Sequence, residues 1–261
     1  MNAFIVIFLP LLTIVRGVPL DHHRIETDPE LTAGYFEGDM VFDANQRNGL
    51  VDPVKRWPNN TVYYKINEDF FRKIERIDDG HRNYIQRAMR IIEEVSCIHF
   101  EDVTGTDKPY YINITGHLNG CYSAVGWWNT VQTYNVAAHP LDKGCFRVGT
   151  IVHELLHTLG FLHMQSAWNR DTYVRIAKEN IEPSMQHNFN KFESDVVDHY
   201  DQEYDYGSVM HYPAYAFSKN GKMTIIPLRE KDAAGVMGQR RTLPKSDVRK
   251  LNIMYKCPKK I

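Results

Sequence analysis

The stretch that decides the fold reads VHELLHTLGFLHMQS and covers residues 152–166. It belongs to a predicted helix over residues 146–159, which Gly160 ends, because glycine accepts the left-handed conformation of a helix C-cap. Three histidines and one glutamate lie within residues 153–163. So many imidazoles in one hydrophobic segment indicate that they act together.

His153 and His157 are four residues apart, so a helix presents both on one face, about 40° apart around its axis. Two imidazoles at this spacing suit a tetrahedral zinc ion. After Gly160 the chain can turn sharply, and His163 can return as a third nitrogen ligand. Three protein ligands leave one position open, which is typical of catalytic zinc. We therefore predict one catalytic zinc ion bound by His153, His157 and His163.

Glu154 lies beside His153, on the edge that faces the open position. A carboxylate there can accept a proton from zinc-activated water, so Glu154 is the predicted general base. A single histidine on an apolar helix usually packs in the core. The long pattern H-E-x-x-H-x-x-G-x-x-H does not fit that interpretation, because it fixes too many positions for chance agreement.

With this motif, the sequence resembles the metzincin metalloproteases and, within them, the astacin family. The stretch SVMHY at residues 208–212 is similar to the family's Met-turn, whereas in isolation it would indicate only a buried turn. The resemblance implies that Met210 forms an apolar floor beneath the imidazoles. It also implies that Tyr212 contacts zinc or stabilises the tetrahedral oxyanion, and that residues 34–257 adopt a zincin fold with an active-site cleft between two halves.

The stretch FEGDM at residues 36–40 resembles the F-x-G-D segment of astacin pro-peptides. By this resemblance Asp39 binds the zinc ion in a latent zymogen and displaces the attacking water. We expect an activating protease to cut near Arg47. The predicted pro-peptide then covers residues 18–47 and the catalytic domain covers residues 48–261, a minimal form of the family with no further domain after it.

In astacins the new N-terminal amine is buried and contacts a glutamate directly after the third histidine, where this chain has Met164. The chain also has Ala167 and Asn169 where the family usually has arginine and aspartate. A buried ammonium without a carboxylate is costly. We therefore expect the amine of Asn48 or Gly49 to remain partly solvated or to bond to backbone carbonyls.

The N-terminus carries an apolar run, AFIVIFLPLLTIV, at residues 3–15, which is too short to span a bilayer as a helix. Small residues follow it, so residues 1–17 are predicted to be a secretory signal. A membrane anchor is the alternative, because no lysine or arginine precedes the run. The predicted location of the protein is extracellular.

Four cysteines suit disulfides in a secreted protein, although their spacing leaves three connectivities open. The family resemblance implies the pairs Cys97–Cys257 and Cys121–Cys145. Asn59 and Asn113 begin N-x-T sequons and are candidate glycosylation sites.

The rest of the chain indicates α+β architecture, with a twisted, mostly antiparallel sheet and helices in the N-terminal half. Residues 81–97 form an amphipathic helix pattern, with Ile85, Met89, Ile92 and Val95 at helical spacing. Strands are expected within residues 61–67, 98–103, 110–116, 121–127 and 133–139. Residues 164–244 are expected to be irregular, and a final helix is expected over residues 246–257 with Ser246 as its N-cap.

The charge composition indicates which classes of partner the protein can bind. The net charge is −1 and the basic residues are scattered, which does not suit a nucleic-acid-binding protein. We expect protein or peptide substrates, and neither nucleic acid nor a membrane as partner. Family members often favour acidic residues just after the cut, and Arg240 or Arg241 could supply that preference; a solvated surface is the alternative for both.

These features predict a secreted, zinc-dependent endopeptidase made as a zymogen. The substitutions after His163 motivate a rival, a catalytically inactive secreted zinc-containing binding protein. Retention of Glu154, Tyr212 and an apparent pro-segment favours the enzyme. A zinc amidase acting on small molecules is the third possibility.

Overall fold

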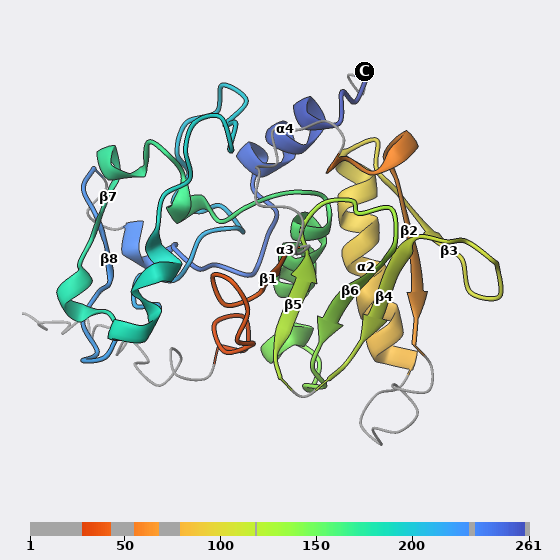
Figure 1. The fold of residues 1–261 in the computed structure, drawn as a ribbon, viewed down its shortest axis with the longest axis horizontal. Coiled ribbons are helices and arrows are strands. Elements are labelled where there is room, and N and C mark those ends of the chain that lie inside the picture. Colours follow the sequence, from red (N-terminus) through yellow and green to blue (C-terminus); the bar gives the residue numbers. More distant parts are fainter. Residues whose placement is uncertain (1–27, 43–54, 68–78, 118, 230–232, 259–261) are drawn as a thin grey trace, which may run out of the picture.

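The fold is known from a computed structural model, which describes residues 28–42, 55–67, 79–117, 119–229 and 233–258. The predicted signal peptide and the predicted cleavage site near Arg47 lie outside these ranges. One half of the molecule is built on a six-stranded sheet with the order β1-β5-β6-β4-β2-β3 (Figure 1). Its strands are β1 (Met40–Val41), β2 (Thr61–Ile66), β3 (His99–Asp102), β4 (Tyr111–Thr115), β5 (Cys121–Ala124) and β6 (Val131–Val136).

The predicted antiparallel character of this sheet is wrong. Four of its five strand pairings are parallel, and only β5 and β6 pair in opposite directions. For the pair β2 and β3, the reason is their connection, which runs through helix α2 (Asp79–Val95). A helical crossover returns the chain to the start of the sheet, so the next strand runs parallel to the first.

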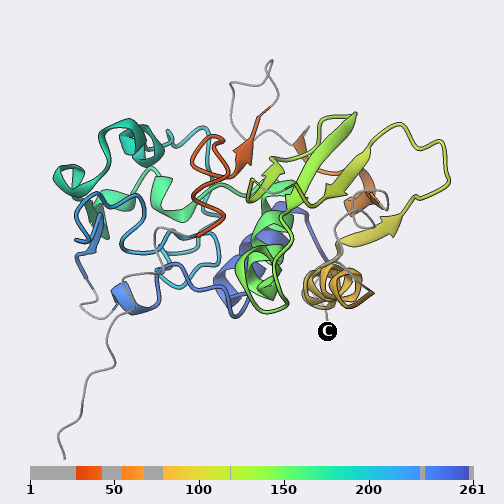
Figure 2. The ribbon, with the colours of Figure 1, turned by 90° about the horizontal axis from the view of Figure 1, so that it is seen from below.

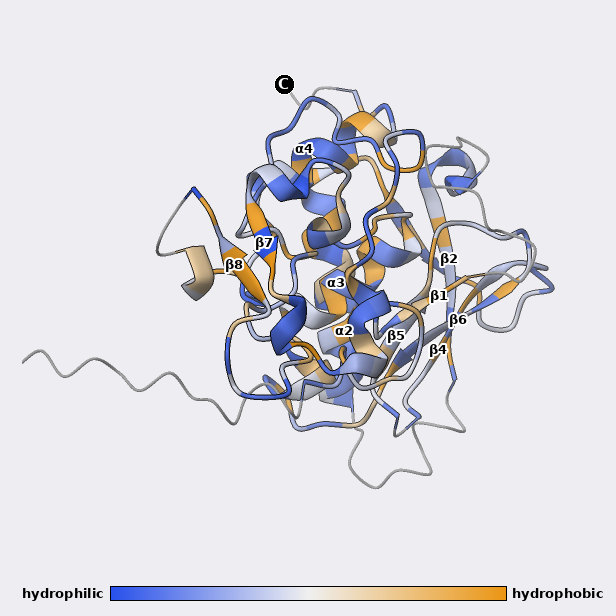
Figure 3. Ribbon diagram, turned by 60° about the vertical axis from the view of Figure 1, so that its left-hand side comes forward, coloured by the Kyte–Doolittle hydropathy of each residue, from blue (hydrophilic) through white to orange (hydrophobic). Residues whose placement is uncertain are grey.

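Helix α2 and helix α3 (Val148–Thr158) lie on the same face of the sheet (Figure 2). The predicted apolar stripe of α2 is confirmed at Ile85, Met89 and Ile92, which are all buried. Val95, at the last position of the helix, is 37% exposed and is not part of the core. The α3 side chains are almost all buried, so this helix runs through the middle of the molecule (Figure 3).

The last helix, α4 (Lys245–Met254), packs Leu251 and Met254 into the same core as the sheet. Its N-cap is Pro244 rather than the predicted Ser246, because the helix already begins at Lys245; the Ser246 hydroxyl donates to the carboxylate of Asp205. The pairs Cys97–Cys257 and Cys121–Cys145 form as the family resemblance implies. The first ties the end of α2 to the C-terminal segment, and the second ties β5 to the turn before α3.

The other half is irregular, as predicted. It contains short 3₁₀ turns and one two-stranded sheet of β7 (Val174–Ile176) and β8 (Ile225–Pro227), packed around a second hydrophobic core. The α+β prediction is therefore confirmed. Within the ranges that the structure describes, no helix combines the length and apolar character needed to cross a bilayer.

Residues 28–42, called the N-terminal segment below, lie between the two halves (Figures 1 and 2). Their strand β1 pairs in parallel with β5 at the edge of the sheet. The backbone carbonyls of Asp39 and Val41 accept hydrogen bonds from the amides of Ser123 and Val125, each at 3.0 Å. The N-terminal segment thus covers the edge of the sheet that would otherwise face the space between the halves.

Candidate active site and metal centre

Three imidazoles meet at one point between the two cores. His153 and His157 project from α3, and His163 returns to them after Gly160, whose φ of 99° turns the chain. All three side chains are buried. The Nε2 atom of His153 lies 3.0 Å from Nε2 of His157 and 3.4 Å from Nε2 of His163. The convergence predicted from the spacing is present.

The outer nitrogens fix which ring atoms face the centre. Nδ1 of His153 donates to the carbonyl of Val209 and Nδ1 of His157 donates to the carbonyl of Phe161, each at 2.8 Å. A carbonyl can only accept, so in the neutral form of each ring the Nε2 atom turns a lone pair inward. Lone pairs facing each other at this distance repel unless a cation lies between them.

The donor set fits zinc. With Zn–N distances of about 2.0–2.1 Å, tetrahedral coordination separates two ligand nitrogens by roughly 3.3 Å. The two separations from His153, 3.0 and 3.4 Å, bracket that value. Neutral imidazoles whose outer N–H is bonded to a carbonyl or carboxylate are also the usual zinc ligands.

Asp39 lies over the three imidazoles, and its ligand atoms are within 4.8 Å of theirs and of one another. Oδ2 is 3.2 Å from Nε2 of His153, and Oδ1 is 3.3 Å from Nε2 of His163. Although burial opposes its ionisation, the interactions with His163 and His157 hold the pKa of Asp39 well below its usual range. A buried anion therefore lies against the three imidazoles.

Glu154 is fully buried, and neither carboxylate oxygen has a hydrogen-bond partner among the described residues. Burial, reinforced by the negative charge of Asp39, raises the pKa of Glu154 well above its usual value. Buried polar groups in native proteins are nearly always bonded.

The residues of the predicted Met-turn are linked both to α4 and to His153. Asp247 of α4 accepts hydrogen bonds from the Ser208 hydroxyl at 2.8 Å and the Val209 amide at 2.9 Å. The Val209 carbonyl in turn accepts the bond from His153. Met210 is buried and, with His163, lines a cavity of about 60 Å³. Asp247 was not predicted from the sequence, because its partners lie far away in the chain.

The Tyr212 side chain is buried, with its ring centroid 4.7 Å from that of His163. Its hydroxyl donates to the backbone carbonyl of Glu37 in a short hydrogen bond. Tyr212 therefore stands beside the third imidazole, but the N-terminal segment holds its hydroxyl.

Glu37 is a site residue that sequence reasoning missed. It is fully buried, and its carboxylate accepts bonds from Nδ1 of His163 and from the Ser166 hydroxyl, each at 2.9 Å. Its position inside the F-x-G-D segment, directly before Gly38 and Asp39, was the feature of the sequence that could have pointed to it. Gly38 makes this approach possible: its φ is 89°, and an added Cβ would lie 2.6 Å from the Glu30 carbonyl oxygen.

Position 164, where the family glutamate is replaced, already faces a cation of this chain. The Met164 sulfur lies 3.3 Å from Nζ of Lys250, and both residues are buried. Burial lowers the pKa of Lys250. A second ammonium beside Lys250 would be repelled, which supports the expectation of a partly solvated N-terminal amine; Asn48 and Gly49 themselves lie outside the described residues.

The other predicted sites differ in accessibility. Arg240 is buried and bonds the carboxylate of Glu30, whereas Arg241 is exposed. Of the two sequons, Asn59 is exposed and Asn113 is half-buried in β4, between β2 and β6.

Comparison with known proteins agrees with this geometry. The family model for astacin, which describes a family of peptidases, matches residues 49–256. Seminal metalloprotease 1 of Drosophila melanogaster is 46% identical over 88% of this chain and 90% of its own length. Zinc metalloproteinase nas-4 of Caenorhabditis elegans is 34% identical over 90% of this chain and 73% of its own length.

A solved structure is similar as well. High choriolytic enzyme 1, a hatching enzyme zinc-protease from Oryzias latipes, superimposes with a TM-score of 0.66 at 32% identity. The match covers 78% of this chain and 94% of that protein. With the matched family model, the relatives and the converging imidazoles, the chain belongs to the astacin family and is a zinc metalloendopeptidase.

Proposed function

We propose that this protein is a secreted endopeptidase that hydrolyses peptide bonds in proteins and is made as a latent zymogen. The observation that carries the proposal is the meeting of three inward-facing Nε2 atoms with the orphaned carboxylate of Glu154. His153, His157 and His163 hold the zinc ion. When bound, zinc supplies Lewis acidity, which polarises the scissile carbonyl and acidifies the attacking water.

Glu154 is the general base. Its carboxylate has no hydrogen-bond partner among the described residues, so both oxygens are available to the attacking water. Glu154 accepts a proton from that water and later delivers it to the leaving amine. The Val209 carbonyl fixes the ring of His153, which keeps the geometry around the reacting atoms constant.

Tyr212 stabilises the developing oxyanion. Its hydroxyl is a buried donor whose present acceptor is the Glu37 carbonyl. When the N-terminal segment leaves, this donor is free for the oxyanion of the substrate.

Latency follows from the same contacts. Asp39 fills the side of the centre that a water and a substrate need, so it acts as the latency switch. Cleavage near Arg47 by another protease separates the pro-peptide, residues 18–47, from the catalytic domain, residues 48–261. The departing segment also exposes the edge of β5, where an extended peptide can bind by strand addition.

Arg240 selects substrates with an acidic side chain near the cut. Its guanidinium is buried and already pairs with an acidic residue of the N-terminal segment, Glu30. Arg241, which is exposed, plays no such part. The signal peptide over residues 1–17 directs the chain to the extracellular space, where the two disulfides are stable and Asn59 is accessible to glycosylation.

The test replaces Glu154 with alanine. The activated variant is expected to keep its zinc and to lose hydrolysis of a denatured protein, while Glu179→Ala, a change on the exposed surface, keeps both. Hydrolysis by the Glu154 variant refutes the assigned base. A wild-type chain that binds zinc but cuts neither protein nor peptides, with or without chelator, identifies the inactive binding protein instead.

A further inference from the structure

The face of the six-stranded sheet that points away from α2 and α3 carries the sequon of Asn113. Within β4, Ile112 and Ile114 are buried in the core that the two helices cover, so Asn113 points to the opposite face (Figure 2). Tyr111, two residues earlier in the same strand, points to that face as well. Both side chains are half-buried. The strand therefore presents an aromatic ring beside the asparagine of a sequon, with part of each side chain open to solvent.

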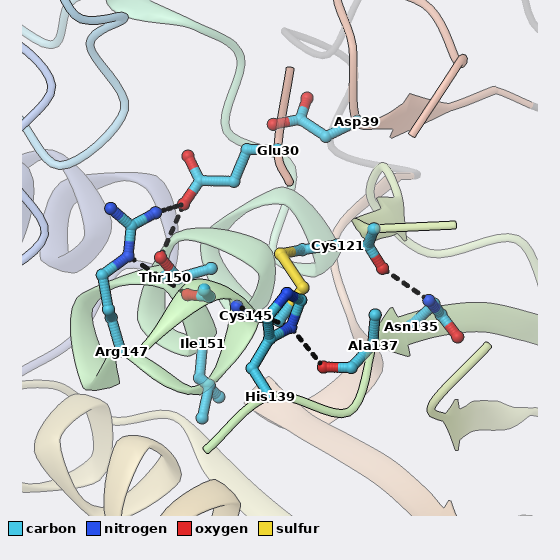
Figure 4. The surroundings of a disulfide bond; sticks show 12 residues. Glu30, Asp39, Cys121, Asn135, Ala137, His139, Cys145, Arg147, Thr150 and Ile151 are labelled. Atoms are coloured by element: carbon cyan, nitrogen blue, oxygen red, sulfur yellow. Dashed lines mark hydrogen bonds and ion pairs between the residues drawn. A yellow bond between two sulfur atoms is a disulfide. The ribbon is translucent and has the colours of Figure 1, made fainter. Parts of the chain in front are cut away.

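The side-chain amide of Asn113 has no structural task of its own. It makes no hydrogen bond within the part of the chain that the structure describes, and neither of its polar atoms is buried. Asn135 on the neighbouring strand β6, near the Cys121–Cys145 disulfide (Figure 4), shows the opposite case. It is fully buried, and its amide donates to the Gly120 carbonyl at 2.6 Å. The Asn113 amide can thus be bonded to a sugar without loss of a contact in the sheet.

The neighbours of Asn113 suit a sugar ring, which has polar groups at its edge and C–H groups on its face. Lys65 of β2 and Thr133 of β6 lie directly opposite Asn113 on either side. The Lys65 ammonium is 4.4 Å from the centroid of the Tyr111 ring and donates to the Thr106 carbonyl at 3.0 Å. These contacts hold the ring in place before any sugar is attached. A surface that is ordered in advance loses little conformational entropy when a second group packs against it.

The other sequon has the same sequence pattern but a different geometry. Trp57 precedes Asn59 by two residues, as Tyr111 precedes Asn113. The Trp57 side chain is only 1% exposed, and its Nε1 donates to the Thr158 carbonyl at 2.9 Å within the core. Asn59 itself is exposed. A sugar on Asn59 therefore cannot reach the ring that precedes it, so the chain contains two matched sites that differ in the accessibility of the ring.

We propose that Asn113 carries an N-linked glycan whose first N-acetylglucosamine packs against the ring of Tyr111 and stabilises the fold, whereas a glycan on Asn59 extends into solvent. In the transfer, Nδ2 of Asn113 forms a bond to C1 of a lipid-linked oligosaccharide, the lipid pyrophosphate leaves that carbon, and Nδ2 releases a proton. The C–H face of the sugar then covers part of the aromatic ring. The inference rests on the proposed passage of the chain through the secretory pathway and does not depend on catalysis.

The full chain, secreted from a cell line that makes only high-mannose glycans, tests this. Mass spectrometry of its glycopeptides is expected to find a glycan on Asn113. Trimming by endoglycosidase H to a single N-acetylglucosamine should leave the melting temperature unchanged, because the first sugar makes the contact. Asn113→Gln should lower the melting temperature by about 2–4 °C, and Asn59→Gln should change it by less than about 1 °C.

Two changes at Tyr111 identify the ring as the partner of the sugar. With Tyr111→Val, which removes the ring and keeps a residue suited to a strand, adding Asn113→Gln should change the melting temperature by less than about 1 °C. With Tyr111→Phe, the full difference should remain. The lost contact with Lys65 affects the chain with and without the glycan alike, so it cancels in this comparison. Thr115 is kept in all variants, because its hydroxyl donates to Asn135 at 2.8 Å.

A measurement without variants is the release of glycans from the folded chain by peptide N-glycosidase, which should free Asn59 before Asn113. A secreted chain with no glycan on Asn113, or one that loses both glycans at the same rate, overturns the inference and leaves the endopeptidase assignment intact. An effect of Asn113→Gln that persists in full with Tyr111→Val overturns the contact with the ring. If the chain is not exported and neither sequon is modified, the proposed secretion and this inference fail together.

Discussion

The carboxylate of Glu37 accepts a hydrogen bond from Nδ1 of His163 at 2.9 Å. The third imidazole of the centre is therefore oriented by a residue that lies before the matched catalytic family region, which begins at residue 49. The other two imidazoles are oriented by carbonyls that remain after activation, those of Val209 and Phe161. Under the proposed activation, the latent and activated forms therefore differ in how His163 is held.

Replacing Glu37 tests that difference. Outer partners of metal-bound histidines typically contribute about 10–100-fold to metal affinity. Glu37→Ala is expected to weaken zinc binding of the uncleaved chain by about that factor, measured by competition with a chromogenic chelator. After activation the variant and the wild type are the same molecule and should bind zinc equally. Equal affinity before activation would contradict the assigned contact.

Asp39 can be tested in a chain that cannot be activated. With Arg47→Ala blocking cleavage, Asp39→Ala is expected to give measurable hydrolysis of a fluorogenic peptide, because the anion over the centre is gone. Glu30 still anchors the segment through Arg240, so adding Glu30→Gln should raise the activity further. Asp195→Asn, on the exposed surface, is the control and should leave the chain latent. A fully latent Asp39 variant would show that other contacts alone exclude the substrate.

The pair of Glu30 and Arg240 predicts a pH dependence. Burial opposes ionisation of Glu30, but the charge of Arg240 outweighs it, so the pKa of Glu30 in the folded chain lies below its ordinary value. A lowered folded pKa means that the pair stabilises the latent chain above the ordinary value and that this stability is lost as the pH falls below it. Urea unfolding from about pH 6 to about pH 3 should show a steeper loss for wild type than for Glu30→Gln. Parallel curves would contradict the prediction.

Asp247 is expected to be structural. Removing its carboxylate leaves the Ser208 hydroxyl and the Val209 amide buried without their acceptor. Asp247→Ala should lower the free energy of unfolding by about 2–4 kcal/mol, measured by denaturant titration. Asp107→Ala, at an exposed position, should change it by less than about 0.5 kcal/mol. A small effect at Asp247 would mean that the Met-turn does not depend on this contact.

Tyr212→Phe separates the role of the hydroxyl, which is the proposed oxyanion donor, from the packing of the ring. In the activated enzyme the loss of one oxyanion donor is expected to lower kcat by about 10²–10³-fold, with little change in KM. The ring itself remains, so the stability of the fold should change little. An unchanged kcat would exclude Tyr212 from stabilising the oxyanion.

Local patterns in the sequence were sufficient to predict the convergence of the three imidazoles and the position of most helices and strands. The spacing of His153, His157 and His163 is a property of one helix and one turn, and the apolar stripe of α2 is a property of one helix. Strand direction was mispredicted, because pairing joins strands far apart in the chain. Ser246 was mispredicted as the N-cap, because the helix already begins at Lys245; the Ser246 hydroxyl donates to Asp205, a partner that local reasoning does not include.

The residues that sequence reasoning missed share one feature. Glu30, Glu37 and Asp247 act through partners that are between 38 and 210 positions away in the chain. No local pattern distinguishes such a charged residue from one on a solvated surface. Even two neighbouring arginines could not be told apart in this way: Arg240 is buried against Glu30, whereas Arg241 is exposed.

The central claim is that three imidazoles bind one zinc ion on which hydrolysis depends. Elemental analysis of the purified, activated chain, combined with an assay on a denatured protein, tests it directly. The account predicts one zinc per chain, loss of hydrolysis when a chelator removes it, and recovery when zinc is returned. A chain that contains no zinc, or that cuts its substrate equally well after the metal is removed, would contradict it.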